Sequence, residues 1–246
     1  MTVVAIIPAR YASSRFPGKP LAPILGQPMI RHVYELARRI PNADDVFVAT
    51  DGEEIAQAVR GFGGKVLMTS KTHRSGTDRL GEAVDLLSLP DDAVVLNVQG
   101  DQPALDPKIP GQLAQALIND PNVPMATVAV NLDPAEAHDP NHVKVVFTDD
   151  FLALYFSRAP IPWNRDGGPR FIYKHVGLYA YRAGFLREFI KWPQSSLEAQ
   201  ENLEQLRALQ RGVPIRVITA LGQAPEVDVP ADIAKVEALL SRNGQR

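Results

Sequence analysis

The 246-residue chain contains no cysteine. It therefore has no disulfides, no thiolate metal sites and no cysteine nucleophile. The formal net charge is only −2, so we expect no general affinity for nucleic acids or for membrane surfaces. The first apolar run is too short for a signal peptide or a membrane span and is followed by Arg10. We therefore expect a cytoplasmic protein.

Two common phosphate-binding patterns are also missing. Walker A requires Gly-x-x-x-x-Gly-Lys-[Ser/Thr], but Gly18-Lys19 is followed by Pro20, and no glycine stands five positions before Gly18. The dinucleotide fingerprint Gly-x-Gly-x-x-Gly is absent from the first strand-to-helix turn. These absences argue against a P-loop NTPase and against a dinucleotide-dependent dehydrogenase.

One apparent metal pair is rejected. His138 and His142 lie four residues apart, but Pro140 between them breaks any helix that would align the two rings.

The hydrophobic pattern predicts alternating strands and helices in the first half of the chain. Hydrophobic residues make up 45% and charged residues 22%, as is ordinary for a globular protein. The expected strands are 3–7, 45–50, 65–68 and 93–98, and the expected helices are 28–40, 51–61, one that follows 73–79 and ends near 87, and 107–118. This rhythm favours an α/β fold with a Rossmann-like, mixed, mostly parallel sheet flanked by helices.

The second half is richer in strands. The expected strands are 126–130, 143–147, 153–157, 174–181 and 214–218, and the expected helices are 183–190, 197–211 and 230–241. No repeat, low-complexity tract or linker separates the halves, so we predict one mixed α/β domain over 1–246.

A long basic loop separates the first expected strand from the first expected helix. It carries Arg10, Arg15 and Lys19 and no acid, while Pro17 and Gly18 keep it irregular. Ligands of α/β sheets bind at the carboxyl ends of strands, where this loop lies. Three cations there favour a polyanion, most simply a triphosphate. The alternative is a solvated basic surface loop.

The turn 75–79 is a second candidate site. Gly76 permits close approach of the backbone to a base, and Arg79 can donate hydrogen bonds to a base carbonyl. Spacing alone favours a plain capping turn instead, with Thr77 as the N-cap and Arg79 on the surface.

Asp101 and Asp228 are candidate metal ligands. Mg²⁺ prefers a few carboxylates together with substrate phosphates and waters, and Asp101 directly follows the strand at 93–98. Taken alone, the two residues equally allow a turn aspartate and a helix N-cap.

Seven strings of the sequence carry a further signal. They are Ile7-Pro8-Ala9-Arg10-Tyr11-Ala12-Ser13-Ser14-Arg15-Phe16-Pro17-Gly18-Lys19-Pro20-Leu21, His73-x-Ser75-Gly76-Thr77-x-Arg79, Asn97-Val98-Gln99-Gly100-Asp101-x-Pro103, Tyr155-Phe156-Ser157-Arg158-Ala159-x-Ile161-Pro162-Trp163, His175-x-Gly177-x-Tyr179-x-Tyr181-Arg182, Leu203-Glu204-Gln205-Leu206-Arg207 and Val227-Asp228-x-Pro230. With these strings in this order, the chain resembles the CMP-Kdo synthetases (3-deoxy-manno-octulosonate cytidylyltransferases) over nearly its whole length. The resemblance implies a nucleotidyltransferase, usually dimeric and Mg²⁺-dependent. Such an enzyme couples CTP to Kdo, releases pyrophosphate and feeds lipopolysaccharide assembly.

The resemblance also implies roles for individual residues. The implied catalytic residues are Arg10, Lys19 and Asp101, and the implied metal ligands are Asp101 and Asp228. The implied nucleotide-binding residues are Arg10, Ser13, Arg15, Lys19, Ser75, Gly76, Thr77 and Arg79. The implied sugar-binding residues are Gln99, Arg158, His175, Tyr179, Glu204 and Gln205, with Arg158 as the partner of the sugar carboxylate. On this basis 1–125 is a nucleotide-binding half, 126–213 a sugar-binding and dimerisation part, and 214–246 a return to the main sheet.

Three alternatives stay open. The segment 164–173 is shorter than in many family members and holds Arg165 and Arg170, and some relatives use an 8-amino variant of Kdo. A cytidylyltransferase for sialic acid is less favoured, because those relatives lack the Arg-Phe-Pro-Gly-Lys-Pro run. A non-catalytic nucleotide-binding module is disfavoured by the retention of Asp101, Asp228 and the loop cations.

Overall fold

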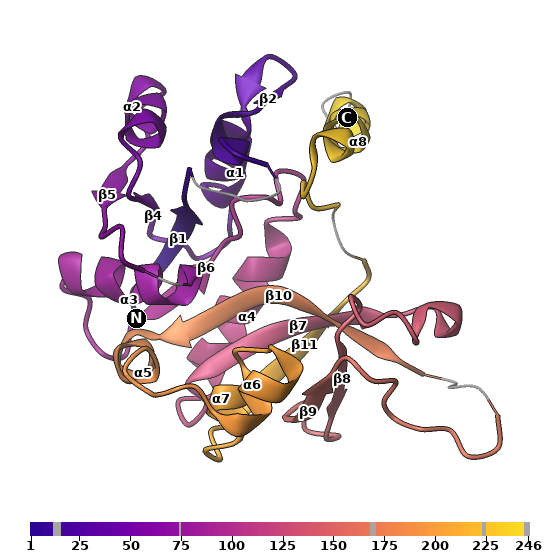
Figure 1. The fold of residues 1–246 in the computed structure, drawn as a ribbon. Coiled ribbons are helices and arrows are strands. Elements are labelled where there is room, and N and C mark those ends of the chain that lie inside the picture. Colours follow the sequence, from indigo (N-terminus) through magenta and orange to yellow (C-terminus); the bar gives the residue numbers. More distant parts are fainter. Residues whose placement is uncertain (12–15, 74, 168–170, 223–224, 244–246) are drawn as a thin grey trace.

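The computed structural model describes residues 1–11, 16–73, 75–167, 171–222 and 225–243, and within them the chain forms a nine-stranded sheet. The strands are β1 (Val3–Ala9), β4 (Asp45–Thr50), β5 (Val66–Met68), β6 (Val94–Asn97), β7 (Met125–Asn131), β8 (Lys144–Phe147), β9 (Ala153–Ser157), β10 (Tyr173–Arg182) and β11 (Ile215–Ala220). Their order is β11-β7-β10-β6-β1-β4-β5, with β8 paired to β10 and β9 paired to β8 (Figure 1).

Helices flank this sheet. They are α1 (Met29–Ala37), α2 (Glu53–Gly61), α3 (Gly76–Leu86), α4 (Lys108–Asn119), α5 (Ala183–Phe189), α6 (Ser196–Glu201), α7 (Leu206–Leu209) and α8 (Ile233–Asn243). The single helix expected at 197–211 is wrong, because α6 ends where Asn202 adopts a left-handed conformation with φ of 52°. Asparagine tolerates that conformation better than most residues, and the chain restarts as α7.

The apolar residues of β1 are buried on both faces of the sheet. Ala5 and Ile7 pack in one cluster with side chains of α1, α2 and α4. Val4 and Ile6 pack in the other with side chains of α3, α5 and α7. A strand covered by helices on both faces carries a continuous apolar run, which explains the sequence pattern.

The sheet is mixed, and the part formed by β1, β4, β5 and β6 is parallel. β1 pairs in parallel with β4 and β6, and β4 pairs in parallel with β5, while β10 runs antiparallel between β6 and β7. This architecture confirms the predicted fold class. The chain passes from β1 to β4 and β5 on one side, then returns to β6 on the other side of β1. The loops at the carboxyl ends of β1 and β6 therefore diverge, and such a switch point leaves a crevice for a ligand.

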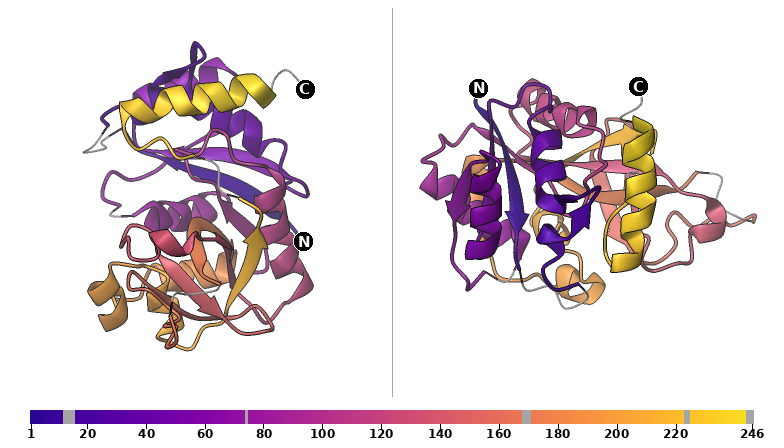
Figure 2. Two further views of the ribbon diagram at one scale, coloured as in Figure 1. Left: turned by 90° about the vertical axis from the view of Figure 1, so that its right-hand side faces the viewer. Right: turned by 90° about the horizontal axis from the view of Figure 1, so that it is seen from above.

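The C-terminal helix closes one end of this crevice region. Val227 and Val236 of the α8 segment are fully buried against Ile24 and Met29. Ile24 belongs to the small hairpin of β2 (Pro23–Ile24) and β3 (Gln27–Pro28), and Met29 directly follows it. Figure 2 shows α8 lying beside that hairpin, away from α5, α6 and α7. The packing carries the segment before α8 past the end of β6, where the Val227 N–H donates to the Asp101 carbonyl at 2.9 Å.

None of the helices in the described ranges is both long enough and apolar enough to span a bilayer.

Candidate active site

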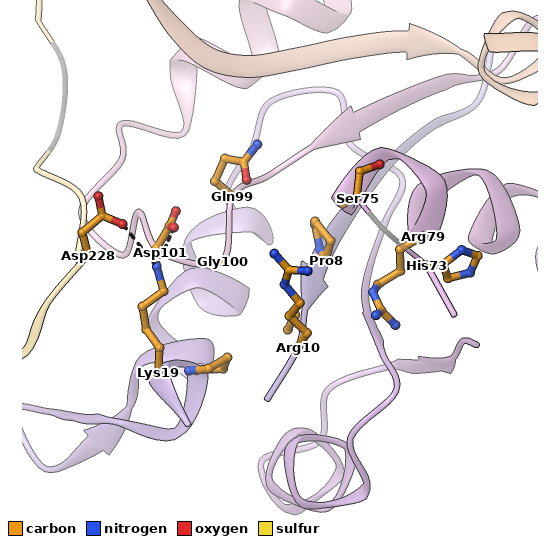
Figure 3. A pocket seen from close by; sticks show the side chains of 13 residues that line it. Pro8, Arg10, Lys19, His73, Ser75, Arg79, Gln99, Gly100, Asp101 and Asp228 are labelled. Atoms are coloured by element: carbon orange, nitrogen blue, oxygen red, sulfur yellow. Dashed lines mark hydrogen bonds and ion pairs between the residues drawn. The ribbon is translucent and has the colours of Figure 1, made fainter. Parts of the chain in front are cut away.

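A cavity of about 260 Å³ lies at the switch point between β1 and β6. Its walls come from the end of β1, the basic loop, the start of α3, the end of β6 and the segment before α8 (Figure 3). The lining residues are Pro8, Ala9, Arg10, Lys19, Pro20, His73, Ser75, Gly76, Arg79, Gln99, Gly100, Asp101 and Asp228. The structure thus brings together predicted nucleotide, sugar and metal residues from four separate sequence strings.

The backbone of the basic loop sets the position of Lys19. Gly18 adopts φ of 70°, which favours glycine, and its N–H donates to the Tyr11 carbonyl at 3.1 Å. Lys19 then begins a short 3₁₀ turn that points its ammonium into the cavity. The predicted contacts of Ser13 and Arg15 lie outside the described residues.

Lys19 is the common partner of the two candidate metal ligands. Its Nζ lies 2.8 Å from Asp101 Oδ2 and 3.7 Å from Asp228 Oδ1. The two carboxylates, separated by 127 positions in the sequence, therefore converge on one cationic position at the cavity wall. Among the described residues, no cluster of three or more histidine or acidic side chains could hold a metal ion. Two carboxylates with further oxygen ligands from a substrate and water are the set that Mg²⁺ prefers, so the site fits that ion.

The turn before α3 differs in detail from the prediction. Ser75, and not Thr77, is the N-cap of α3, and it forms a capping box in which Asp78 returns a hydrogen bond to the Ser75 N–H. Thr77 is wrong as the cap because it lies within the first turn, where the Ser75 hydroxyl already serves the free N–H of Asp78. The N-terminus of α3 therefore faces the cavity, with Ser75 and Gly76 in its wall.

Arg79 is not a surface residue. Its side chain is only 4% exposed, and the guanidinium lies 3.2 Å from Asp51 Oδ2 and donates to the Thr69 hydroxyl. Arg79 still lines the cavity. Sequence reasoning missed Asp51 and Thr69, although both directly follow a strand on the same edge of the sheet.

His73 also lines the cavity and forms a hydrogen bond with Glu82. Burial raises the pKa of Glu82, but hydrogen bonds from His73 and from the Ser70 N–H outweigh it and leave the pKa below its ordinary value. His73 belongs to the string 73–79, but no role was predicted for it.

A second cavity of about 310 Å³ adjoins the first, because Gln99 and Asp101 line both. Its other lining residues are Gln102, Asn141, Val143, Lys174, His175, Gly177 and Glu226. The Gln99 Nε2 donates to the Gly177 carbonyl at 2.8 Å, which fixes this side chain at the boundary. Lys174 and Glu226 had not been predicted, since nothing in their spacing links them to the nearby strings.

His175 is a buried, neutral wall of the second cavity. The Thr127 hydroxyl donates to the Leu178 carbonyl at 2.8 Å, so the His175 Nε2, 3.0 Å from that hydroxyl, must be the donor to it. This tautomer leaves Nδ1 as an acceptor. Burial, with a smaller effect of Lys174, lowers the pKa of His175 to about 3.

The buried imidazole should make the protein sensitive to acid. The pKa of about 3 is below the unfolded value near 6.5, so the unfolded chain binds more protons in this interval and stability falls as the pH falls from 6.5 toward 3. We expect the free energy of unfolding to be about 2 kcal/mol lower at pH 5 than at pH 7 from this residue alone. In urea denaturation, the free energy of unfolding of His175→Gln should differ less between pH 7 and pH 5 than that of the wild type.

His138→Gln is the matched control, because the His138 side chain is exposed. Its difference in stability between pH 7 and pH 5 should equal that of the wild type. If His175→Gln loses as much stability between pH 7 and pH 5 as the wild type, the buried His175 is not the cause of the acid sensitivity.

A neighbouring group holds Thr77, which was predicted to bind the nucleotide, together with three predicted sugar-binding residues. Among the described residues, Thr77, Tyr179, Glu204 and Gln205 line neither cavity. Tyr179 packs against His175 with ring centroids 5.4 Å apart, and Thr77 Oγ1 donates to Glu204 Oε2 at 2.5 Å. The Gln205 side chain is buried, and its Nε2 has no hydrogen-bond partner within the part of the chain that the structure describes.

Arg158 is not brought to either cavity. Its guanidinium donates to the carbonyls of Glu201 and Pro140, both at 2.8 Å. In this arrangement Arg158 ties the end of β9 to neighbouring loops, and its predicted contact with a sugar carboxylate stays a prediction.

The fold and the crevice define an α/β nucleotidyltransferase. A sequence model of the family described as cytidylyltransferase matches residues 4–216. The chain belongs to this cytidylyltransferase family, and the comparisons with individual proteins confirm its resemblance to the CMP-Kdo synthetases.

Individual proteins show which kinds of cytidylyltransferase the chain is similar to. The 8-amino-3,8-dideoxy-manno-octulosonate cytidylyltransferase of Shewanella halifaxensis (strain HAW-EB4) is 52% identical over 243 residues, 98% of this chain and 99% of that protein. The solved structure of CMP:2-keto-3-deoxy-manno-octonic acid synthetase complexed with CTP is 44% identical, covers 99% of this chain and 100% of that one, and gives a TM-score of 0.94. The structure of 4-diphosphocytidyl-2C-methyl-D-erythritol synthase is 15% identical over 98% of this chain and 100% of that one, with a TM-score of 0.66, and shows only the shared fold.

Proposed function

We propose that this cytidylyltransferase transfers CMP from CTP to 8-amino-3,8-dideoxy-manno-octulosonate and releases pyrophosphate. The observation that carries the proposal is the 52% identity, over nearly the full length of both proteins, to an enzyme of that name. Kdo is the first substrate expected from the sequence and the 8-amino sugar is the alternative, and the relative named above supports the alternative. The product would be an activated sugar for lipopolysaccharide assembly.

The first cavity suits the triphosphate of CTP. Arg10 and Lys19 reach it from the basic loop, and the N-terminus of α3 adds the positive end of a helix dipole. A solved relative, 44% identical, contains CTP. Two phosphate-binding cations and a helix N-terminus around one crevice support nucleotide binding at this position.

The reaction is a displacement at the α-phosphorus. The anomeric oxygen of the sugar forms the new P–O bond, the bond to the bridging oxygen of the β-phosphate breaks, and pyrophosphate leaves with that electron pair. The hydroxyl proton passes to solvent. Lys19 and Arg10 counter the negative charge that accumulates on the phosphate oxygens, so catalysis is mostly positioning and charge stabilisation.

Asp101 and Asp228 would hold Mg²⁺ at the same site. When bound, the ion supplies positive charge to the phosphate oxygens. The Lys19 ammonium lies close to both carboxylates and offsets part of their negative charge.

The second cavity suits a zwitterionic sugar acid. Lys174 supplies a cation for a carboxylate, whereas Glu226 and Asp101 supply negative charge. His175 offers an acceptor at Nδ1, and Gln205 nearby carries a buried donor that lacks a partner among the described residues. Acceptors with negative charge favour an ammonium over a neutral hydroxyl.

Kdo is the second candidate substrate, supported by the likeness to the solved CMP:2-keto-3-deoxy-manno-octonic acid synthetase. We also propose a homodimer, as is usual in the family that the chain resembles.

Pyrophosphate release tests the proposal. Each of the four NTPs is combined with the 8-amino sugar, Kdo and sialic acid. We expect turnover with CTP and the 8-amino sugar, with the other NTPs and sialic acid inactive. Binding of CTP in calorimetry without turnover on any sugar would contradict the proposal and favour a nucleotide-binding module.

A further inference from the structure

The Glu204 carboxylate connects the sugar side of the molecule to the wall of the first cavity. It accepts a hydrogen bond from Thr77 Oγ1 at 2.5 Å, and the Ser75 hydroxyl also interacts with it. Ser75 in turn lines the cavity at the N-terminus of α3. The α3 turn therefore helps to hold this carboxylate, which is predicted to act on the sugar side.

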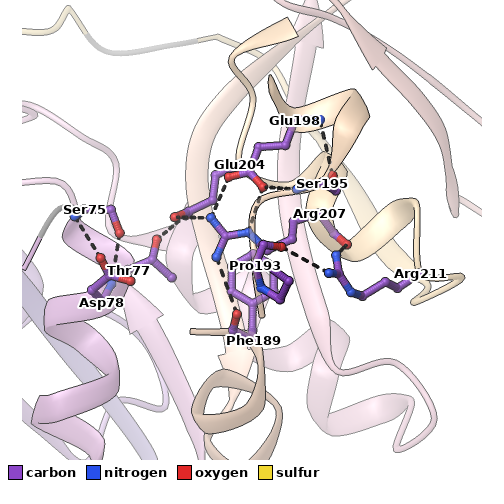
Figure 4. Close-up of polar contacts among 10 residues, drawn as sticks. All are labelled: Ser75, Thr77, Asp78, Phe189, Pro193, Ser195, Glu198, Glu204, Arg207 and Arg211. Atoms are coloured by element: carbon purple, nitrogen blue, oxygen red, sulfur yellow. Dashed lines mark hydrogen bonds and ion pairs between the residues drawn. The ribbon is translucent and has the colours of Figure 1, made fainter. Parts of the chain in front are cut away.

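Arg207 on α7 lies beside this carboxylate. Its Nη2 is 3.6 Å from Glu204 Oε1, and its side chain is 11% exposed. The guanidinium also makes a bidentate pair with Glu198 of α6, with Nε 2.8 Å from Oε2 and Nη2 2.5 Å from Oε1. The Phe189 ring stacks on it with its centroid 4.9 Å away (Figure 4). The position of this cation is fixed from two sides before it reaches Glu204.

Glu198 is itself held rigidly. Its side chain is 7% exposed and accepts a hydrogen bond from the Ser195 N–H at 3.1 Å, while the Ser195 hydroxyl accepts one from the Glu198 N–H at 3.3 Å. This capping box starts α6. A buried pair whose partners are both fixed by other contacts is suited to positioning a third group.

We propose that Arg207 is a positioning residue that holds the Glu204 carboxylate against the α3 turn in the orientation that binds the sugar acid. The inference rests on the proposed function, because it assigns Arg207 a part in that same transfer. Arg207 touches neither cavity, and it acts through Glu204.

The charges that face Glu204 make this role measurable. Burial raises the pKa of Glu204 above its ordinary value, and Asp78 on α3 adds to this. The hydrogen bonds from Thr77 and Ser75 and the Arg207 cation act in the opposite direction. Removal of Arg207 should raise this pKa further, so that the carboxyl group takes up a proton at a higher pH and loses acceptor capacity.

Two tyrosines of β10 also lie in the field of Glu204. Burial, together with the negative charge of Glu204, raises the pKa of Tyr179 and of Tyr181, so both phenols stay neutral at working pH. Glu198 is held in a bidentate ion pair with Arg207 in the wild type, and Arg207→Lys keeps a cation at this position. The acidic limb of sugar use in these two proteins should therefore report on Glu204.

The test measures kcat and KM for the sugar and for CTP across pH in Arg207→Met and Arg207→Lys. We expect Arg207→Met to raise the KM for the sugar about tenfold with the KM for CTP within about twofold, since one charged contact is lost on the sugar side alone. The acidic limb of kcat/KM for the sugar should move to higher pH. Arg207→Lys keeps the charge, so its kcat/KM for the sugar should fall at nearly the same acidic pH as that of the wild type.

Arg211→Met is the matched control. Arg211 lies just beyond α7, stacks over Trp192 at 5.0 Å and donates to the carbonyls of Arg207 and Pro193, both at 3.1 Å. Arg211→Met should leave the acidic limb of kcat/KM for the sugar and both KM values unchanged. Arg207→Gln replaces the methionine variant if the latter does not fold, as judged by CTP binding in calorimetry, and should give the same shift.

An unmoved acidic limb in the uncharged variants, or equal losses in Arg207→Met and Arg207→Lys at every pH, would overturn the positioning role while leaving the proposed function intact. A wild-type protein that turns over neither sugar acid would instead contradict the proposed function itself.

Discussion

Asp101→Asn is expected to lower the rate of pyrophosphate release roughly a thousandfold. The Asp101 carboxylate lies 2.8 Å from the Lys19 ammonium, at the boundary that both cavities share. The substitution keeps the shape of the side chain and removes the negative charge, so the site loses a candidate Mg²⁺ ligand and the ion partner that aligns Lys19. The measurement is steady-state pyrophosphate release with CTP and the 8-amino sugar.

Asp106→Asn is the control for this change. Asp106 is an exposed residue of the same loop that caps the Lys108 N–H, a contact that an asparagine can also make. Its activity should stay within about twofold of the wild type. A comparable loss in both variants would mean that the loop is merely disturbed, and activity near the wild-type level in Asp101→Asn would contradict the site.

Lys19→Met should reduce kcat by roughly a hundred- to a thousandfold. Lys19 is the described cation that contacts both carboxylates and faces the crevice, so its loss removes charge stabilisation when the phosphates become more negative. In the free protein the same substitution leaves Asp101 and Asp228 without this shared counter-ion. We therefore expect Lys19→Met to bind Mg²⁺ alone more tightly than the wild type in calorimetry.

The control is Lys71→Met, which alters an exposed lysine outside both cavities. It should leave kcat and Mg²⁺ binding unchanged. If Lys19→Met has the kcat of the wild type, Lys19 is not a catalytic residue, even if the substitution changes the affinity for Mg²⁺.

The fold could be predicted largely because local patterns determine its first half. The continuous apolar runs of β1 and β6 and the amphipathic helices between them indicate a doubly covered parallel sheet. The division of 197–211 into α6 and α7 could not be predicted, because it depends on one left-handed residue, Asn202, inside a helical pattern. The order of strands around β10 likewise depends on long-range pairing that no local pattern carries.

The candidate site was predicted where motifs are continuous and missed where it depends on tertiary contacts. Lys19 and Asp101 stand in quoted strings, and the structure places them 2.8 Å apart. Asp51 and Thr69, which hold Arg79, come from the ends of other strands, and neighbouring parallel strands bring them together only in the folded sheet. Arg158 donates to backbone carbonyls, a pairing that no local pattern could predict, and its expected contact with a sugar carboxylate stays a prediction.

A competition measurement tests the central claim most directly. The wild-type protein is given CTP, Mg²⁺ and equal concentrations of the 8-amino sugar and Kdo, and the two CMP-linked products are separated by the charge of the amino group. The account predicts that CMP-8-amino sugar forms at least about tenfold faster, as one charge-assisted contact would produce. Equal formation of both products, or an excess of CMP-Kdo, would contradict it.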